Sequence, residues 1–332
     1  MTILVTGGAG YIGSHMVYEL VDAGEPVVVL DNLSTGFRFL LPGSVPFVTG
    51  STGDRELVAQ TIARYGVTAI IHFAASVVVP ESVADPLAYY SNNTMNTCSL
   101  LQAAVENGVK HVVFSSTAAV YGNPALVPVR EDAATVPISP YGSSKLMSEI
   151  LLHDTGRAYG LRFVILRYFN VAGADPAMRT GQSTPQATHL IKVACETALG
   201  KRPRLDVFGT DYATADGTCV RDYIHVSDLA RAHSATLDYL RGGGASATFN
   251  CGYGRGASVL EVIAAVKRVS GIDFPVEIGP RRAGDPAELV ADVGRITATL
   301  DWHPRYQELD TIVAHALAWE RRLPGKRSNT GV

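Results

Sequence analysis

The feature that most constrains the fold is a glycine-rich loop, GGAGYIG over residues 7–13, placed between a strand and a helix. Residues 2–6 are apolar enough for a short buried strand, and residues 11–23 carry apolar side chains at helical spacing. Glycines let such a loop turn tightly and approach a pyrophosphate, while the start of the helix offers its free N–H groups to the anion. We therefore predict a dinucleotide-binding loop formed by Gly7, Gly10, Tyr11, Ile12 and Gly13, with Gly8 completing the pattern G-x-G-x-x-G.

The acid at the end of the next apolar segment indicates which dinucleotide binds. Asp31 follows the β-branched run 27–30, eighteen positions after Gly13. A carboxylate at this position can accept hydrogen bonds from the adenosine ribose, and it would repel a 2′-phosphate. The sequence therefore predicts NAD rather than NADP. A glycine-rich turn alone also occurs in ordinary strand–helix connections, but the flanking strand, helix and acid together favour nucleotide binding.

Strand-like and helix-like segments alternate through the first half of the chain. The strand-like runs are 69–73, 111–115 and 163–166, and helical segments cover 54–65 and 86–107. This order is typical of an α/β fold with a Rossmann-type, doubly wound parallel sheet. We predict an NAD-binding domain over 1–170 and a smaller mixed α/β substrate-binding domain over most of 171–330. A segment of about 222–255 is expected to return to the first domain, and Ser258 with Glu261 predicts a capped helix that ends near Gly271.

Composition excludes several classes of protein. Hydrophobic residues make up 47% of the 332 residues and charged residues 18%, below the usual share of about 25%, so the chain is not disordered. The formal net charge of −3 leaves no basic surplus for phosphates, and we expect no nucleic-acid partner. No apolar run reaches the roughly 18 residues of a membrane helix, and the N-terminus does not look like a signal peptide, so we expect no membrane association.

The four cysteines are far apart and form no C-x-x-C pattern, which argues against a zinc site and against a disulfide framework. We expect free, buried thiols in a reducing cytoplasm and no bound metal. The residues are Cys98, Cys195, Cys219 and Cys251.

A second motif, SPYGSSK, reads as the start of a helix. Ser139 can cap this helix, and Pro140 suits its first position. Tyr141 and Lys145 then lie one turn apart on one face, and a nearby ammonium would lower the pKa of the tyrosine toward neutrality. Tyr141 would thereby become a usable base.

A hydroxyl residue, Thr117, follows a strand-like run at the sheet edge where parallel α/β folds place ligands. Its side chain could hydrogen-bond a substrate oxygen. Alone, a tyrosine–lysine pair is a common pattern of a helix surface, and a threonine is a common loop residue. Combined with the glycine-rich loop, Thr117, Tyr141 and Lys145 indicate a catalytic site.

Taken in order, these motifs resemble those of the UDP-glucose (UDP-galactose) 4-epimerase family, within the extended short-chain dehydrogenase/reductase superfamily. The resemblance covers about residues 1–322. The segments that carry it are TGGAGYIGSH (6–15), DNLS (31–34), HFAA (72–75), SSTAAVYG (115–122), YGSSK (141–145), LRYFN (166–170), VFGTDY (207–212), DGTCVRDYIHV (216–226) and PRRAGD (280–285).

The resemblance implies a reversible inversion at C4 of a UDP-hexose, either UDP-galactose or UDP-glucose. In the family, tightly held NAD takes a hydride from C4 while a tyrosine removes the proton of the 4-hydroxyl. The 4-keto sugar then turns over, and the hydride returns to its other face. On this chain Tyr141 would be the base and later the acid, Lys145 would lower its pKa and bind the nicotinamide ribose, and Thr117 would contact the 4-oxygen.

The resemblance also implies the remaining contacts. Those to the cofactor would come from Asn32, Ser51, Thr52, Phe73, Ala74, Ala75, Asn92 and Phe169, in addition to the loop and Asp31. Those to the substrate would come from Asn170, His189, Leu190, Val207, Phe208, Arg221, Arg282, Asp285 and Leu289, in addition to Thr117. The arginines match diphosphate-binding positions, the aspartate a position that binds the uridine ribose, and the Val-Phe pair the cradle of uracil.

Four positions depart from the family pattern. Ser51 replaces an acid that commonly binds the adenine amino group, Val77 replaces a lysine near the cofactor, and His189 replaces a substrate-side asparagine. Leu289 lies where some members carry a bulky Tyr and others a small Cys. UDP-N-acetylhexosamines and UDP-pentoses therefore stay open as substrates.

Two other functions fit the sequence less well. Nucleotide-sugar 4,6-dehydratases usually carry an Asp-Glu pair just after the threonine, but Ala118 and Ala119 cannot transfer protons. A catalytically silent NAD-sensing protein could lose the tyrosine, which is present here. The resemblance further implies a homodimer formed by two helices per subunit, here 86–107 and 140–159, whose apolar faces could equally be intramolecular core.

Overall fold

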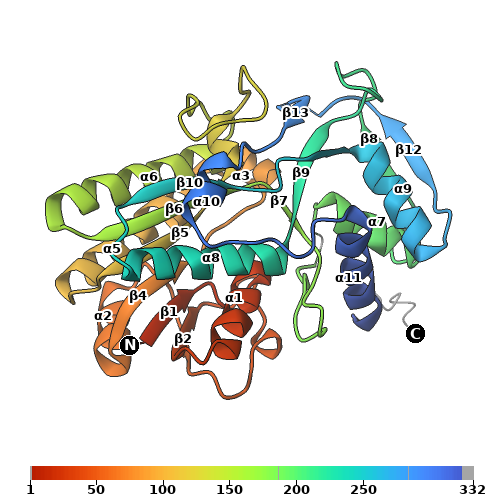
Figure 1. Ribbon diagram of the computed structural model, residues 1–332. Coiled ribbons are helices and arrows are strands. Elements are labelled where there is room, and N and C mark those ends of the chain that lie inside the picture. The colour runs from red at the N-terminus through yellow and green to blue at the C-terminus, as the bar shows by residue number, and fades with distance from the viewer. Residues whose placement is uncertain (1, 186, 283, 324–332) are drawn as a thin grey trace.

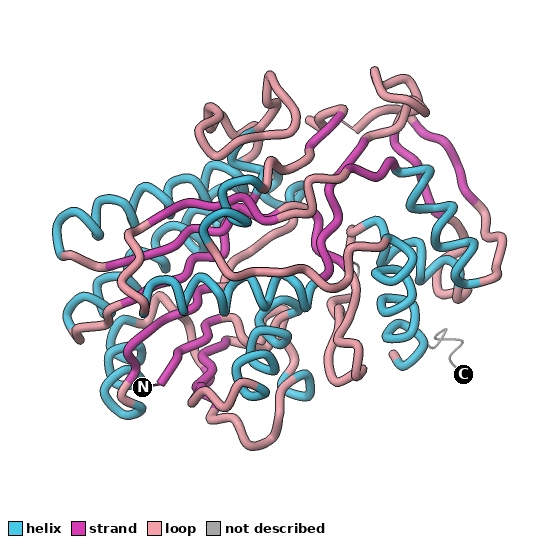
Figure 2. The backbone as a smooth tube through the Cα atoms, in the orientation of Figure 1, coloured by secondary structure: helices cyan, strands magenta, loops and turns pink. Residues whose placement is uncertain are grey.

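The computed structural model describes residues 2–185, 187–282 and 284–323, and it shows a large helix-covered sheet beside a smaller lobe (Figure 1; Figure 2). Within these residues the large sheet has seven strands in the order β10-β6-β5-β4-β1-β2-β3, and all neighbouring pairs are parallel. The strands are β1 (Thr2–Thr6), β2 (Val27–Asp31), β3 (Phe47–Thr49), β4 (Val67–His72), β5 (His111–Thr117), β6 (Arg162–Tyr168) and β10 (Ala247–Cys251). The predicted Rossmann-type α/β fold is confirmed.

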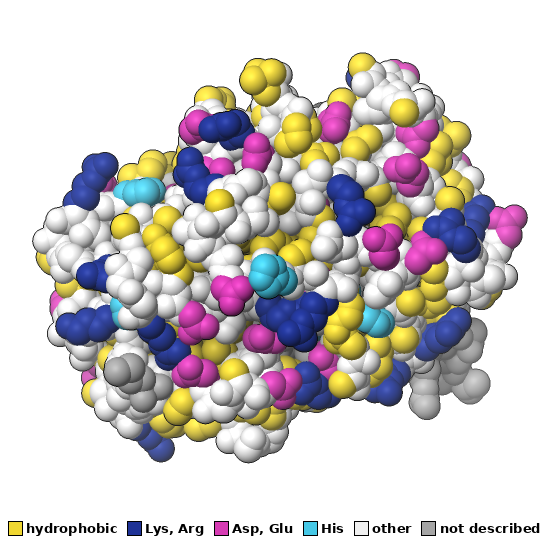
Figure 3. All heavy atoms as spheres, in the orientation of Figure 1, with side chains coloured by type: hydrophobic (Ala, Val, Ile, Leu, Met, Phe, Trp, Pro, Cys, Tyr) yellow, Lys and Arg dark blue, Asp and Glu magenta, His cyan; other side chains and the backbone are white. Residues whose placement is uncertain are grey.

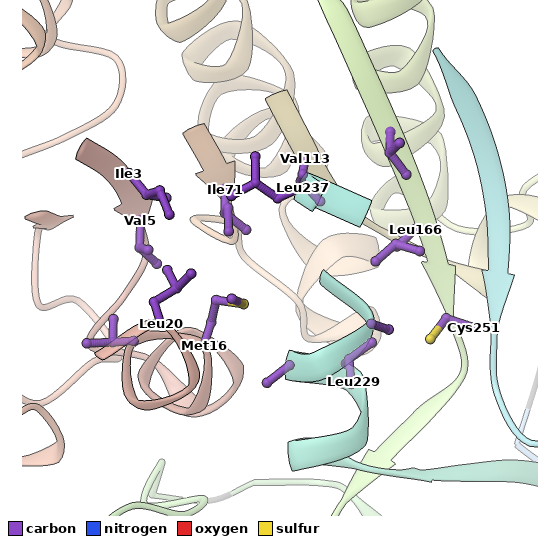
Figure 4. Packing of buried hydrophobic residues seen from close by; sticks show 14 of the residues in the cluster. Ile3, Val5, Met16, Leu20, Ile71, Val113, Leu166, Leu229, Leu237 and Cys251 are labelled. Atoms are coloured by element: carbon purple, nitrogen blue, oxygen red, sulfur yellow. The ribbon is translucent and has the colours of Figure 1, made fainter. Parts of the chain in front are cut away.

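Helices cover both faces of this sheet. α1 (Tyr11–Asp22) and α8 (Val226–Arg241) pack on one face, and α2 (Arg55–Tyr65), α5 (Asn96–Glu106) and α6 (Pro140–Tyr159) pack on the other. In the first of these layers, Met16 and Leu20 of α1 lie near Val5 of β1 (Figure 4). Burial on both faces explains why the strands read as continuous apolar runs.

The smaller lobe has two short sheets and a core of its own. One sheet joins β11 (Gly256–Ser258), β9 (Val220–His225) and β13 (Glu288–Leu289), with β7 (Asn170–Ala172) also paired to β9, and the other joins β8 (Leu205–Phe208) to β12 (Val276–Gly279). Side chains of α7 (Leu190–Ala198), α9 (Val259–Ser270) and α11 (Leu309–Arg322) fill the core. The predicted capping box at Ser258 and the left-handed Gly271 after α9 are both present.

The chain passes between the two lobes several times. α8 and β10 lie with the large sheet, whereas β9, at the start of the predicted returning segment of about 222–255, pairs within the smaller lobe. α10 (Gly294–Thr299) then packs against β10 through Ile296, which belongs to the core of the large sheet. The two lobes are thus tied together by more than one crossing.

The helix predicted over 86–107 is interrupted. It divides into α4 (Pro86–Tyr89), a π-helical segment η2 (Tyr90–Met95) and α5, and it is preceded by α3 (Val79–Ala84). Asn93 on η2 accepts the Ser76 N–H at 2.8 Å and donates to the Ser76 carbonyl and to the Ser144 hydroxyl. These contacts favour the wider turn, a feature that is frequent at functional sites. Short 3-10 turns occur at η1 (Arg38–Leu40) and η3 (Ala118–Tyr121).

None of the helices in residues 2–185, 187–282 and 284–323 is long and apolar enough to cross a membrane. The same residues contain no group of three or more His, Cys, Asp or Glu that could hold a metal. The cysteines are free, and they are buried apart from the half-buried Cys98. On the face shown in Figure 3, Lys and Arg side chains are interspersed with Asp and Glu.

Candidate active site

The glycine-rich loop lies at the carboxyl end of β1, between the ends of β2 and β4. Gly7 has φ +68°, and a Cβ there would lie 2.6 Å from the backbone nitrogen of Ala74. A Cβ on Gly13 would overlap the Gly7 carbonyl oxygen. In the described chain, α1 begins at Gly10 with no side-chain cap and no acid in its first turn, which leaves this helix start suited to an anion. The loop therefore fits a dinucleotide pyrophosphate.

Asp31 holds this loop from the end of β2. Its Oδ2 accepts the Ala9 N–H at 2.9 Å, and its Oδ1 accepts the Leu33 N–H at 2.7 Å. Burial raises the pKa of Asp31, and these two hydrogen bonds oppose the rise. Each carboxylate oxygen keeps a further lone pair for a ribose hydroxyl, and the next residue, Asn32, is exposed.

The other predicted cofactor residues follow the carboxyl ends of β3, β4 and β6 or lie on η2. Ser51 and Thr52 follow β3. The Gly50 N–H donates to the Asp31 carbonyl at 3.0 Å, and this hydrogen bond holds the segment that leads to Ser51 and Thr52 close to the end of β2. Asn92 on η2 donates to Ser76 Oγ at 3.0 Å. The residues Phe73, Ala74 and Ala75 directly follow β4, and Phe169 directly follows β6.

Tyr141 lies in the first turn of α6. The Gly142 N–H donates to the capping Ser139 Oγ at 3.2 Å, and Pro140 begins the helix, as predicted. Thr117 lies at the end of β5. Burial raises the pKa of Tyr141, and the side chain of Thr117 opposes this rise. The prediction of a lowered pKa is wrong for the chain without ligands, because the buried phenolate would lose its hydration.

Lys145 follows one turn later and is 3% exposed. Its Nζ lies 4.2 Å from the centre of the Phe114 ring on β5, a cation–π contact. Burial lowers the pKa of Lys145 to about 7, while the charge of Glu149 acts in the opposite direction. Burial, with a smaller effect from Lys145, also lowers the pKa of His72 to about 3. Lys145 is thus a buried cation whose charge depends on its neighbours.

The sequence reasoning missed the buried polar groups behind these residues. Glu149 on α6 forms a 2.6 Å ion pair with Arg167 on β6, and Asn93 joins η2 to α6. Glu149 could have been found, because it continues the four-residue spacing of Tyr141 and Lys145 by another turn. Asn93 carried no comparable signal.

Four predicted substrate residues come together in the smaller lobe. Arg282 Nε donates to Asp285 Oδ2 at 2.9 Å, and Arg221 Nη2 lies 3.8 Å from Asp285 Oδ1. The Arg282 guanidinium also lies 5.4 Å from the ring centre of Phe208, which is exposed. Two cations, an acid and an aromatic ring can together bind a nucleoside diphosphate.

The side chain of the neighbouring Val207 points away from that of Phe208. Strand alternation turns its side chain into the core of the smaller lobe, while Phe208 points outward. Within the predicted uracil cradle, Phe208 therefore offers a side chain and Val207 offers its backbone.

A small cavity brings together other predicted substrate residues. Asn170, His189 and Leu190 line it, from the start of β7 and the start of α7. Gln182 Nε2 lies 2.8 Å from His189 Nδ1 and orients the ring. Asn170, Gln182 and His189 give the lining of this cavity polar groups that can form hydrogen bonds.

Leu289 lies beside both a predicted substrate residue and a predicted cofactor residue. It is the register partner of Arg221 between β13 and β9. Its buried side chain belongs to the same cluster as Phe169 and Ala118. A predicted substrate residue and a predicted cofactor residue therefore share one packed environment.

The chain is similar in sequence and in fold to known proteins. The model of the NAD dependent epimerase/dehydratase family matches residues 3–252. A UDP-glucose 4-epimerase of Azospirillum brasilense is 60% identical over 321 residues, which are 97% of this chain and 92% of that protein. Among solved structures, the Brucella ovis UDP-glucose 4-epimerase in complex with NAD has a TM-score of 0.93 at 45% identity, covering 96% of this chain and 97% of that one.

A further solved structure, the UDP-glucose 4-epimerase of Bifidobacterium longum in complex with NAD⁺ and UDP, also has a TM-score of 0.93. It is 37% identical and covers 98% of this chain and 99% of that one. The match to the family model spans most of the chain, and the similarity to these relatives spans nearly all of it. The chain belongs to the NAD dependent epimerase/dehydratase family.

Proposed function

We propose that this chain is an isomerase that inverts C4 of a UDP-hexose and thereby interconverts UDP-galactose and UDP-glucose. The observation that carries the proposal is the pairing of Tyr141, in the first turn of α6, with Thr117 at the end of β5, at the same sheet edge as the glycine-rich loop. The similarity to UDP-glucose 4-epimerases over nearly the whole chain supports the same reaction. NAD, when bound, supplies a hydride acceptor for the sugar C4 and returns the hydride.

The residues of the chain would remove the proton of the sugar 4-hydroxyl and return one. Tyr141 takes the proton of the 4-hydroxyl and later gives one back, and Thr117 hydrogen-bonds the 4-oxygen and the tyrosine. Lys145 adds a positive charge that favours the phenolate. Gly7, Gly10 and Gly13 would hold the pyrophosphate of the cofactor, and Asp31 its adenosine ribose.

The smaller lobe would hold the UDP. A diphosphate offers Arg221 and Arg282 anionic oxygens in place of Asp285, and bidentate contacts of arginine suit such a group. Asp285 is then free to accept the uridine ribose hydroxyls, with Phe208 beside the base. We accordingly assign NAD binding to 1–170 with α8 and β10, and UDP-sugar binding to most of 171–330.

Dehydration is disfavoured by the residues after Thr117. Ala118 and Ala119 form the start of η3, and the Ala119 N–H donates to Thr117 Oγ1 at 3.1 Å. Neither side chain can transfer a proton at C5 or C6. The sugar would therefore return to its 4-hydroxyl form without loss of water.

A homodimer is supported by an apolar surface over α3, α4, η2 and α6. Its most exposed members include Leu87 at 76% and Met95 at 65%. The surface also contains Val79, Val83, Met147 and Ile150. A contiguous apolar surface of this kind is typical of a protein interface. Light scattering should give twice the chain mass, and the mass of a single chain would contradict the dimer.

A cytoplasmic location is supported by the free cysteines, which fit a reducing compartment.

The proposed reaction is tested by incubating the purified protein with UDP-galactose, without added NAD, and following the sugar by NMR. Formation of UDP-glucose would support an epimerase that retains its cofactor. Activity that appears only with added NAD would point to weak retention, for which Ser51 and Val77 are the departures to examine. If no activity appears in either case, the proposed substrate is wrong.

A further inference from the structure

A buried ion pair lies behind the catalytic residues. Glu149 on α6 is 2% exposed and Arg167 on β6 is 7% exposed. Arg167 Nη2 donates to Glu149 Oε2 at 2.6 Å, and its Nε donates to Oε1 at 3.1 Å. Ser116 Oγ donates to the same Oε1 at 2.5 Å. Because Ser116 and Arg167 are register partners on β5 and β6, this one carboxylate joins α6 to two strands.

The residues that make these contacts are neighbours of the proposed reacting residues along β5 and α6. Ser116 precedes Thr117 on β5, and Glu149 lies one helical turn after Lys145 and two turns after Tyr141. Thr117 and Tyr141 belong to the same two elements, β5 and α6. A movement of α6 along β5 would therefore change the distance between these two side chains.

The guanidinium is held on its other side as well. Arg167 Nη1 donates to the Tyr121 hydroxyl at 3.0 Å and to the Glu131 carbonyl at 3.3 Å. The Tyr121 hydroxyl in turn donates to Asn250 Oδ1 on β10 at 2.7 Å. Arg167 is thus a fixed anchor to which Glu149, and with it α6, is attached.

Such a pair is not explained by stability alone. The loss of hydration offsets much of the attraction between two buried charges, and apolar side chains of similar size can stabilise a core equally well. What the charges provide here is a defined geometry and an electric field close to Lys145.

We propose that Glu149 and Arg167 are positioning residues of the active site, whose ion pair holds α6 against β5 and whose two opposite charges together set the charge state of Lys145. This inference rests on the proposed function. The charged and titratable groups around Lys145 are Tyr141 and Glu149 on its own helix, His72 on β4, and Arg167 beyond Glu149 on β6.

The charge of Lys145 near neutral pH depends on this balance. Burial lowers the pKa of Lys145 to about 7, and the Glu149 carboxylate opposes the fall. If turnover needs the ammonium, kcat decreases as the pH rises through the pKa of Lys145. Any change in the nearby charges should therefore move the alkaline limb of the pH profile of kcat.

The test compares this limb in two single variants with UDP-galactose as substrate. Glu149→Gln removes the negative charge and leaves the cation, so the limb should move down by about one pH unit. Arg167→Gln leaves the carboxylate without its cationic partner, so the limb should move up, and by less, because Arg167 lies beyond Glu149. The double variant should lie between them, and KM should change little in all three.

Opposite shifts in the single variants would establish the inference. A merely structural role would lower kcat at every pH, and a limb that stays in place or moves the same way in both variants would overturn the proposal. Should Glu149→Gln fail to fold, the upward shift in Arg167→Gln decides alone. An unmodified protein without turnover would instead contradict the proposed function.

The matched control is Asp228→Asn on α8, which removes a carboxylate that is fully buried and paired with Arg231. This variant should lose stability but leave the alkaline limb in place. A limb that also moved in Asp228→Asn would show that any buried charge has this effect, and would overturn the specific assignment to Glu149 and Arg167.

Discussion

The Asp31 carboxylate and the Ala9 N–H are joined by a hydrogen bond of 2.9 Å, although the two residues are 22 positions apart in the chain. The acid that ends β2 therefore shapes the glycine-rich loop and is also placed to bind a ribose. A single side chain connects the fold of the loop to the affinity for the cofactor.

Replacing Asp31 by Ala should weaken NAD binding by tenfold or more, because hydrogen bonds to a charged group are each worth about 1.5–3 kcal/mol. Calorimetric titration of the NAD-free protein measures the change. Asp273→Ala, which removes an exposed partner of Lys267 in the smaller lobe, is the control and should bind NAD normally. Unchanged affinity in Asp31→Ala would contradict the assignment of this carboxylate.

Replacing Tyr141 by Phe should lower kcat by about a hundredfold or more while NAD stays bound, because a general base contributes on this scale. Tyr159→Phe, at the exposed far end of the same helix, is the matched control and should keep full activity. Turnover and cofactor content are measured on the same preparation. Near-normal turnover in Tyr141→Phe would remove the tyrosine from the proposed mechanism.

Much of the large sheet and of its helices could be predicted, because each of these elements is determined by a short stretch of sequence. The loop, the apolar strands and the capped start of α6 each follow from a short stretch of sequence, and the structure has them at the expected residues. The interruption by η2 could not be predicted, because it depends on contacts of Asn93 with Ser76 and Ser144, which are distant in sequence.

The pKa of Tyr141 and the side-chain direction of Val207 could not be predicted either, because both depend on residues that are distant in the sequence. The pKa of Tyr141 depends on burial that no spacing rule reports. The inward side chain of Val207 depends on the pairing of β8 with β12, and β12 lies about seventy residues later in the chain. The positions of Arg221 and Asp285 came from the resemblance, and the fold is what brings them to the same place.

Replacing Leu289 by Tyr should lower turnover of UDP-N-acetylglucosamine by about tenfold or more relative to UDP-glucose, because a larger side chain takes space from the C2 substituent. Competition between the two sugars in one reaction measures the ratio directly. Since Leu289 packs in the cluster with Phe169, a thermal melt should confirm that the variant is folded. Equal losses on both sugars would contradict the steric explanation.

The buried His233 should make the protein sensitive to acid. Burial lowers its pKa to about 4, and its ring centre lies 4.7 Å from that of Phe73. Between pH 6.5 and about 4 the unfolded chain therefore binds a proton that the folded chain does not, and the free energy of unfolding falls as the pH falls.

His233→Phe should remove about 1.4 kcal/mol per pH unit of this dependence. Denaturant unfolding at several pH values between 6.5 and 4.5 measures the slope. The exposed His303→Gln is the control and should leave it unchanged. An equally steep slope in His233→Phe would show that other groups cause the sensitivity to acid.

The central claim is that the sugar loses and regains the same hydride within one active site. The most direct measurement uses UDP-galactose with deuterium at C4, without added NAD, and follows the product by NMR and mass spectrometry. The expected product is UDP-glucose that keeps the deuterium at C4. UDP-glucose that has exchanged this deuterium for solvent hydrogen would contradict the central claim, as would an accumulating 4-keto product that has lost water.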